Sequence, residues 1–193
     1  MQKLPIGIQT FTKIREEEYR YVDKTKIAFE LINNGNYYFL SRPRRFGKSL
    51  FLSTLQAVFE GQKDLFRDLY IHDIWDWDTT YPVVKISFAG VARNVAAMQQ
   101  DIRNILKDNQ ERLNIDCRNQ EDTGGCLREL IRKASEKYQQ KVVILVDEYD
   151  KLILDNLDQI EIAREAREIL KDLYTIIKDC DEYIKFAFFT GVS

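Results

Sequence analysis

The sequence is poor in histidine, cysteine and proline. Its 193 residues include one histidine, His72, together with three cysteines and three prolines. With so few ligands, a histidine-based catalytic triad or a multi-histidine metal site would have to be built around His72 alone, which disfavours both. The cysteines, Cys117, Cys126 and Cys180, are widely spaced and include no Cys-x-x-Cys pair. An odd number of cysteines with no disulfide or metal-binding spacing argues for a reducing compartment and against structural zinc.

Long apolar runs and an excess of one charge are also missing. No run approaches the roughly 20 apolar residues of a membrane span, and no signal peptide opens the sequence. The net charge of −2 gives no overall attraction to nucleic acid or to a membrane. We therefore expect a cytoplasmic protein with no membrane partner. Because no repeat or linker interrupts residues 1–193, we expect a single domain with 1–36 packing on its core.

A basic, lysine-bearing turn stands between an apolar run and a helical pattern. Residues 37–40 predict a buried strand, and the apolar residues of 50–59 recur at helical spacing up to Gly61, a C-terminal cap. Between them lies the run SRPRRFGKS, residues 41–49. Strand, tight loop, Gly-Lys-Ser and helix is the layout of a phosphate-binding loop. Main-chain N–H groups and the helix N-terminus would surround a phosphate, Lys48 would reach the β- and γ-phosphates, and Ser49 would bind Mg²⁺.

The match to the loop consensus is incomplete. Gly-x-x-x-x-Gly-Lys-Ser/Thr places its first glycine at position 42, where this sequence has Arg42 followed by Pro43. A Gly-Lys-Ser tripeptide is common by chance, so a basic turn that simply begins a helix is the alternative.

A second pattern decides between these alternatives. Residues 142–146, VVILV, predict a strand buried on both faces, as in parallel sheets, and Asp147 and Glu148 follow directly. Ligands bind at this end of such strands, beside the loop of another parallel strand. Asp147 would hold Mg²⁺ through a water opposite Ser49, and Glu148 would orient or deprotonate the attacking water. The alternative is an acidic cap for the next helix.

A third strand, predicted at 183–189, ends in Thr190, whose hydroxyl would contact the γ-phosphate or the attacking water. Other patterns predict helices and one more strand. The helices are expected at 24–33, 62–70, 95–113, 127–139 and 160–177, and the strand at 82–88. Residues 114–125 read as a polar loop and the main site of disorder.

Two features have both a structural and a functional interpretation. The apolar residues before position 25 either cover a sheet edge or form a flap against the nucleotide base, and we favour the cover. Trp75 and Trp77 either pack on the core or form a base-stacking platform, and we favour packing.

Several blocks together resemble the predicted AAA-ATPase-like domain family. They are residues 5–9 (PIGIQ), 21–25 (YVDKT), 42–49 (RPRRFGKS), 146–151 (VDEYDK) and 190–193 (TGVS). The resemblance covers essentially the whole chain. It implies a three-layer α/β P-loop NTPase with a mainly parallel central sheet, helices on both faces, and an extra strand between the loop strand and the acidic strand. It also implies that Arg42 is the family's own variant.

The resemblance further implies site residues and partners. Arg45, Phe46, Gly47, Lys48, Ser49 and Leu50 would bind ATP, Ser49 and Asp147 would hold Mg²⁺, and Lys48, Glu148 and Thr190 would be catalytic. Such proteins often carry a C-terminal nuclease-like domain, a fifth strand and a lid, so the chain reads as truncated after its fourth strand. Self-association and nucleic acid bound through the missing domain are then expected partners.

Three functions follow from these residues. The first is Mg²⁺-dependent ATP hydrolysis that switches or drives an attached effector. The second is a small-molecule P-loop kinase, for which no acceptor pocket is recognisable. The third is a nucleic-acid-binding module in which Arg42, Arg44 and Arg45 contact phosphates without nucleotide turnover. The first needs both the loop and the acid pair, and both are present.

Overall fold

The protein is built around one four-stranded sheet. A computed structural model describes residues 3–90 and 94–192. Its strands are β1 (Tyr37–Ser41), β2 (Val83–Ser87), β3 (Val142–Asp147) and β4 (Ile184–Gly191). Their order is β1-β4-β3-β2, and each neighbouring pair is parallel. The expected strand between the loop strand and the acidic strand is therefore β4. Ser193, which the sequence assigned to the end of this strand, lies outside the described residues.

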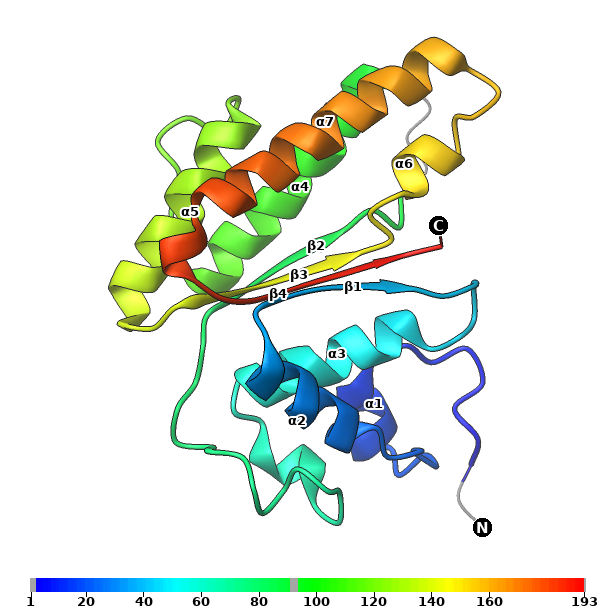
Figure 1. The fold of residues 1–193 in the computed structure, drawn as a ribbon, viewed down its shortest axis with the longest axis vertical. Coiled ribbons are helices and arrows are strands. Elements are labelled where there is room, and N and C mark those ends of the chain that lie inside the picture. The colour runs from blue at the N-terminus through cyan, green and yellow to red at the C-terminus, as the bar shows by residue number, and fades with distance from the viewer. Residues whose placement is uncertain (1–2, 91–93, 193) are drawn as a thin grey trace.

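Helices cover both faces of the sheet, as Figure 1 shows. One face carries α1 (Phe11–Glu16), α2 (Thr25–Asn34), α3 (Lys48–Phe59) and the 3-10 helix η1 (Lys63–Phe66). The other carries α4 (Val95–Leu113), α5 (Thr123–Tyr138), α6 (Lys151–Leu154) and α7 (Ile160–Asp179). A short 3-10 helix, η2 (Asp181–Tyr183), precedes β4. The three-layer α/β fold is confirmed.

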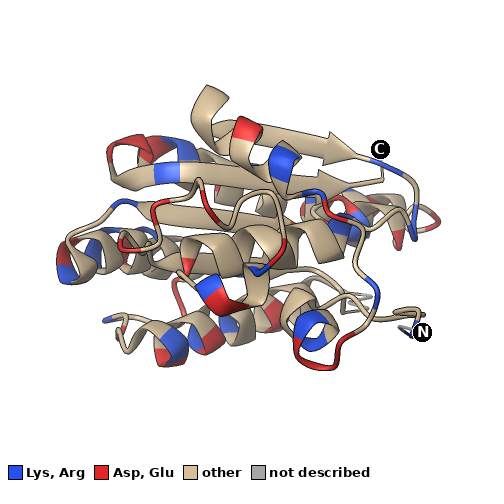
Figure 2. Ribbon diagram, turned by 90° about the horizontal axis from the view of Figure 1, so that it is seen from below, with Lys and Arg blue, Asp and Glu red and all other residues tan. Residues whose placement is uncertain are grey.

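The sheet separates two apolar cores. Alternate residues of each strand point to opposite faces, so Val143 and Leu145 of β3 pack with α3, whereas Ile144 and Val146 pack with the α4–α7 layer. All six residues of β3 are buried, as its apolar run predicts. Charged residues of both signs are distributed along the helices and connections in the ribbon of Figure 2. No helix in residues 3–90 and 94–192 has the length and apolar content that crossing a membrane requires.

The prediction that β1 is buried was wrong. Tyr37 and Phe39 are 40% and 50% exposed, while Tyr38 and Leu40 are partly buried and pack against the α3 core. Its aromatic residues are exposed because β1 lies at the edge of the sheet, where only its α3 face is covered. An aromatic run of four residues cannot by itself distinguish a central strand from an edge strand.

The other predicted helices and strands are present to within a few residues, except in two connections, while the short helices α1 and α6 were not predicted. The helix expected over 62–70 is only the single 3-10 turn η1. Arg15 of α1 donates its side-chain hydrogen bonds to the carbonyls of Leu65 and Arg67, at 2.7 Å each. These bonds hold the segment after η1 against α1, and Asp68, with a φ of 63°, turns the chain off a helical path.

The second exception is the connection between α4 and α5. The helix α5 begins at Thr123, inside the predicted loop 114–125, because the Asp122 carboxylate accepts a hydrogen bond from Gly125 N at 2.8 Å and caps it. Cys117 and Cys126 form a disulfide, a pairing that the odd number and wide spacing of the cysteines did not predict. Gln110 also accepts a hydrogen bond from Cys117 N, at 2.8 Å. The connection is anchored rather than disordered.

The N-terminal residues pack on α3 rather than over a sheet edge. Phe11 and Ile14 of α1 are fully buried, and Phe11 N donates to the Ser53 hydroxyl at 3.0 Å. Ile6 and Val22, however, are 87% and 68% exposed, so the expectation that all apolar residues of this segment are covered was wrong.

The two tryptophans belong to the same layer. Trp75 lies against Phe59 with ring centres 5.9 Å apart, and Trp77 lies against Phe66 at 5.0 Å. Trp77 Nε1 donates to the His72 carbonyl at 2.7 Å. These contacts support packing on the core rather than a base-stacking platform.

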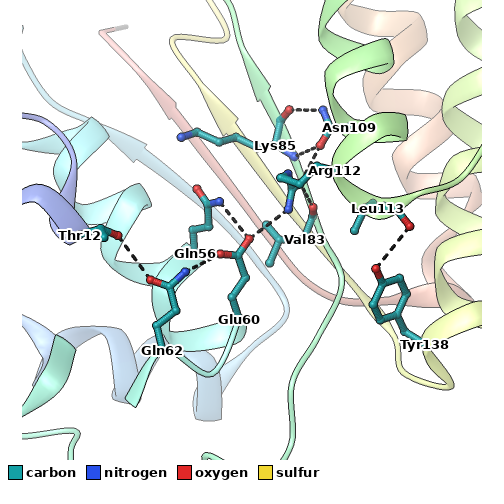
Figure 3. A network of polar contacts seen from close by, with 10 residues as sticks. All are labelled: Thr12, Gln56, Glu60, Gln62, Val83, Lys85, Asn109, Arg112, Leu113 and Tyr138. Atoms are coloured by element: carbon teal, nitrogen blue, oxygen red, sulfur yellow. Dashed lines mark hydrogen bonds and ion pairs between the residues drawn. The ribbon is translucent and has the colours of Figure 1, made fainter. Parts of the chain in front are cut away.

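At the opposite edge of the sheet, side chains of α4 cover the outer strand. Asn109 accepts from Lys85 N at 2.8 Å and donates to Lys85 O at 2.7 Å, which imitates a neighbouring strand (Figure 3). Arg112 donates to the Val83 carbonyl and pairs with Glu60 at 3.0 Å. The edge of β2 is thereby closed to further strand pairing.

Asp23 fastens the start of α2 to the chain after η1. Its carboxylate accepts hydrogen bonds from Thr25 N at 2.7 Å and from Tyr70 N at 2.8 Å. The buried Thr25 hydroxyl donates to Asp23 and accepts from Ile71 N at 3.2 Å. Partial burial opposes ionisation, but the hydrogen bonds from Tyr70 and Thr25 outweigh it and lower the pKa of Asp23 below its ordinary value of 3.8.

Asp23→Asn is expected to lower the free energy of unfolding by roughly 1 kcal/mol at pH 7. Because the pKa of Asp23 is lower in the folded protein, the carboxylate stabilises the fold above pH 3.8 and loses this effect as the pH falls through its folded value. Urea unfolding should show that the difference in free energy of unfolding between parent and variant is smaller at pH 3 than at pH 7. Asp78→Asn is the control. A difference in free energy of unfolding that grows in acid would contradict the stabilising role of the ionised Asp23 carboxylate.

Candidate phosphate-binding site

The loop, the acid pair and Thr190 meet at one edge of the sheet. Leu40 and Ser41 of β1 pair with Thr190 and Gly191 of β4. On the other side of β4, Val146 of β3 pairs with Phe189. Because the strands are parallel, the residues that follow β1, β3 and β4 all emerge at the carboxyl edge. The loop strand and the acidic strand are thus separated by β4 alone.

The phosphate-loop candidate is an exposed turn that enters α3 through a glycine. Residues 41–47 are all exposed. Gly47 has a φ of 77°, which side-chain-bearing residues rarely adopt, and an added Cβ would meet no atom within 4 Å. Glycine is therefore needed for backbone conformation and not for space. Arg45 has a φ of 71°, so the loop bends sharply twice.

The first turn of α3 has main-chain donors available for a ligand. Gly47 is its N-cap and provides no side-chain hydrogen bond to the turn. The first N–H groups of a helix have no partner within the helix, and the helix dipole makes this end positive. The amides of residues 48–50 are therefore candidate donors to an anion, and the loop that precedes them is exposed.

Lys48 places a cation in this turn without a balancing carboxylate. Lys48 is only 7% exposed, and its Nζ donates to the carbonyls of Arg42 at 2.8 Å and Pro43 at 3.1 Å. Within the described part of the chain, Lys48 forms no salt bridge; the neighbouring Asp155 pairs with Arg44 and Lys151 instead. A buried ammonium with only carbonyl partners favours an anion beside it.

The other predicted loop residues differ in exposure. Ser49 and Leu50 are partly buried, whereas Arg45 and Phe46 lie on the surface, Phe46 with 69% exposure. Arg42 N donates to the Gly191 carbonyl at 3.3 Å, which ties the start of the loop to the end of β4.

The Thr190 hydroxyl links the two acidic residues. Thr190 is fully buried; its Oγ1 donates to Asp147 Oδ1 at 2.5 Å and accepts from Glu148 N at 3.2 Å. Its carbonyl accepts from Tyr149 N at 2.9 Å. The single hydroxyl hydrogen of Thr190 is therefore engaged by Asp147. Direct contact of Thr190 with a phosphate stays a prediction.

Glu148 does not continue the strand. The strand β3 ends at Asp147, and Glu148 has a φ of 53°. Such a conformation in a non-glycine residue is uncommon and is found at functional sites when its surroundings enforce it. Here the bond from Glu148 N to Thr190 holds the bend, while the Glu148 residue remains partly exposed.

Sequence reasoning did not find the contact between the loop and α6. Arg44 Nη2 lies 3.7 Å from Asp155 Oδ1, and Asp155 also pairs with Lys151. Lys151 Nζ donates to the Gly90 carbonyl, beyond β2, at 3.2 Å. The pairing of Lys151 with Asp155 has the i,i+4 spacing of a helix, which is the one sequence signal available. The link to Arg44 depends on tertiary structure.

The residues at this edge fit a nucleoside triphosphate with Mg²⁺. An accessible helix N-terminus and an unbalanced ammonium suit phosphate. The Ser49 hydroxyl and the Asp147 carboxylate are the oxygen ligands that Mg²⁺ prefers, and Asp147 has a second oxygen besides the one bonded to Thr190.

A parallel sheet in the order β1-β4-β3-β2, with helices on both faces and a lysine-bearing loop after β1, defines a P-loop NTPase-like α/β domain. The chain belongs to the predicted AAA-ATPase family, whose family model matches residues 5–193. Membership of this family implies nucleotide binding.

One relative is described as an uncharacterized protein in the vnfD 5′ region of Azotobacter chroococcum mcd 1. It is 53% identical over 194 residues. The match covers 100% of this chain but 37% of the relative, so the chain spans just over a third of that protein's length. No solved structure matches the chain.

Proposed function

We propose that the domain binds ATP with Mg²⁺ at the carboxyl edge of the sheet and hydrolyses it. The observation that carries this proposal is Lys48. Its ammonium is nearly buried at the start of α3 and is bonded to two loop carbonyls, with no carboxylate bonded to it in the described residues. An anionic ligand would supply the missing countercharge.

Each group at the site has a stated task in this proposal. The α3 amides and Lys48 bind the β- and γ-phosphates, and Ser49 and Asp147 would hold Mg²⁺. The metal would neutralise charge that develops on the phosphate oxygens. Glu148 orients the attacking water and accepts its proton. Thr190 keeps Asp147 and Glu148 in fixed relative positions through its two hydrogen bonds. Through these two bonds, β4 ties the Asp147 carboxylate to the main chain of Glu148.

Hydrolysis is proposed to switch or drive an effector elsewhere in a longer polypeptide. The relative in Azotobacter is much longer than the matched region, which leaves room for such a part. The Arg44–Asp155 contact gives one route by which the state of the loop would reach α6, because phosphates would compete with Asp155 for Arg44.

A titration with ATP and GTP, with and without Mg²⁺, tests the proposal. We expect saturable ATP binding that weakens at least about tenfold without Mg²⁺, phosphate release without any added acceptor, and a melting temperature that rises with nucleotide. Phosphate release without an acceptor separates an ATPase from a kinase. Absent nucleotide binding, together with DNA binding that falls steeply with salt, would overturn the proposal in favour of a nucleic-acid module.

A further inference from the structure

The carboxyl end of β2 brings a serine beside the Asp147 carboxylate. Ser87 is the last residue of β2, and its register partner is Asp147, the last residue of β3. The pairing persists to this end, because Phe88 N donates to the Asp147 carbonyl at 3.2 Å. The two strands run side by side in Figure 1, and neighbouring strands of a sheet lie about 4.8 Å apart. Ser87 and Asp147 are therefore lateral neighbours at the edge that carries the candidate site.

Both side chains also lie on the same face of the sheet. Along β2, Val83 packs in the α3 core and Val84 in the opposite core, and the side chains of a strand alternate between faces. Ser87, four residues after Val83, thus lies on the α3 face. Asp147 lies on the same face, because it stands four residues after Val143, which packs in the α3 core. This is the face on which the lysine-bearing turn begins α3.

Asp147 consequently stands between two hydroxyl groups. On the β4 side, the Thr190 hydroxyl donates to Asp147 Oδ1. On the β2 side, Ser87 is partly exposed, and its hydroxyl forms no hydrogen bond within the part of the chain that the structure describes. The two hydroxyls therefore differ in use. That of Thr190 fixes the carboxylate, whereas that of Ser87 is available to a ligand of the site.

The Asp147 carboxylate favours a cation at this position. Asp147 is 7% exposed, and no salt bridge to it is formed within residues 3–90 and 94–192. Burying a carboxylate without a countercharge costs free energy, which a bound cation offsets. Mg²⁺ is commonly held by only one or two carboxylates and keeps several of its waters. Those waters in turn need hydrogen-bond acceptors around the metal.

We propose that Ser87 is a positioning residue for the Mg²⁺ of the nucleotide site, its hydroxyl accepting a hydrogen bond from a water of the metal's coordination shell beside Asp147. This inference rests on the proposed function, since it assigns a further residue to the same metal. A serine hydroxyl has two acceptor lone pairs and a rotatable hydrogen, so it can accept from such a water. A water also bridges polar groups that are neighbours but do not bond each other directly, as Ser87 and Asp147 are.

The Mg²⁺ dependence of nucleotide binding tests the proposal. At saturating ATP, the melting temperature of the parent should rise with Mg²⁺ concentration, and the midpoint of this rise gives the apparent metal affinity. Ser87→Ala should move the midpoint about fivefold higher, the size of one lost hydrogen bond. Ser87→Thr keeps the hydroxyl and should restore the midpoint to within about twofold of the parent. Ser135→Ala on α5, also partly exposed, is the matched control and should leave the midpoint unchanged.

Two further measurements separate a role at the metal from a role in folding. Without nucleotide, Ser87→Ala should melt within about 2 °C of the parent, because the substitution breaks no hydrogen bond among the described residues. In EDTA, its ATP affinity should equal that of the parent, since Ser87 acts only through the metal. At saturating Mg²⁺, its rate of hydrolysis should stay within about twofold of the parent's.

The outcomes distinguish this inference from the proposed function. An unchanged midpoint in Ser87→Ala, with a parent that binds Mg²⁺–ATP, would overturn the role of Ser87 and leave the proposed function standing. An equal loss of ATP affinity with and without Mg²⁺, or a shift that Ser87→Thr does not reverse, would also overturn it, because the hydroxyl would then not act on the metal. A parent that binds no nucleotide at any Mg²⁺ concentration would overturn both proposals.

Discussion

Lys48→Met is expected to reduce ATP affinity by at least about 100-fold and to abolish hydrolysis. Lys48 provides the only buried ammonium at the loop, and its partners are the carbonyls of Arg42 and Pro43. Losing a charge-assisted contact to phosphate in a desolvated position typically costs about 2–5 kcal/mol, and 100-fold corresponds to about 2.7 kcal/mol. Isothermal titration with Mg²⁺–ATP measures the change.

Methionine preserves most of the apolar length of the lysine side chain, so the variant should fold. Its circular dichroism and melting temperature without nucleotide should match the parent closely, because a buried charge is removed together with its desolvation cost. Lys107→Met, at an exposed position of α4, is the matched control and should bind ATP normally. ATP binding by Lys48→Met with the parent's affinity would remove the loop from the proposed function.

Glu148→Gln is expected to separate binding from hydrolysis. The variant should bind ATP within about threefold of the parent and hydrolyse it roughly 10²–10⁴-fold more slowly, because glutamine fills the same space but cannot accept a proton. The bend at Glu148 is held by its main-chain N–H bond to Thr190, which the substitution leaves intact. Single-turnover phosphate release gives the rate, and titration gives the affinity.

The exposed Glu165→Gln on α7 is the control for this experiment and should keep the parent's rate. Equal hydrolysis by Glu148→Gln and the parent would assign the proton transfer to another group. A parallel loss of affinity and rate would show that Glu148 acts in binding instead. Either result would leave the prediction for Lys48 unaffected, since that residue belongs to a different element.

Local patterns in the sequence predicted most elements of the fold. The five consecutive apolar residues of 142–146 became the fully buried β3, and the helix predicted at 95–113 has those bounds in the structure. Both succeed because their periodicity is long or extreme enough to exclude other structures. The helix expected over 62–70 did not form: Arg15, fifty residues away from Leu65, bonds the carbonyls of Leu65 and Arg67, and Asp68 turns the chain with a positive φ. No local pattern contains that long-range contact.

The candidate site also has a part that the sequence predicted and a part that only the structure shows. Gly47, Lys48, Ser49, Asp147 and Glu148 were predicted from residue types next to strand ends, and the structure brings these strand ends to one edge. The structure adds how they are held. The Thr190 hydroxyl engages Asp147 and Glu148, and Asp155 reaches Arg44. These contacts join residues more than forty positions apart, which spacing alone does not reveal.

The sequence by itself determined the four strands and most of the helices, and that a cation and two acids would follow strand ends, because hydrophobic periodicity and residue chemistry are local properties. Only the tertiary structure decided that β1 is an edge strand with half-exposed aromatic residues, that β4 is the strand expected between the loop strand and the acidic strand, and that the Thr190 hydroxyl bonds both Asp147 and the main chain of Glu148. Strand order depends on how distant segments pack against each other. Each segment is compatible with several neighbours until the whole core is assembled.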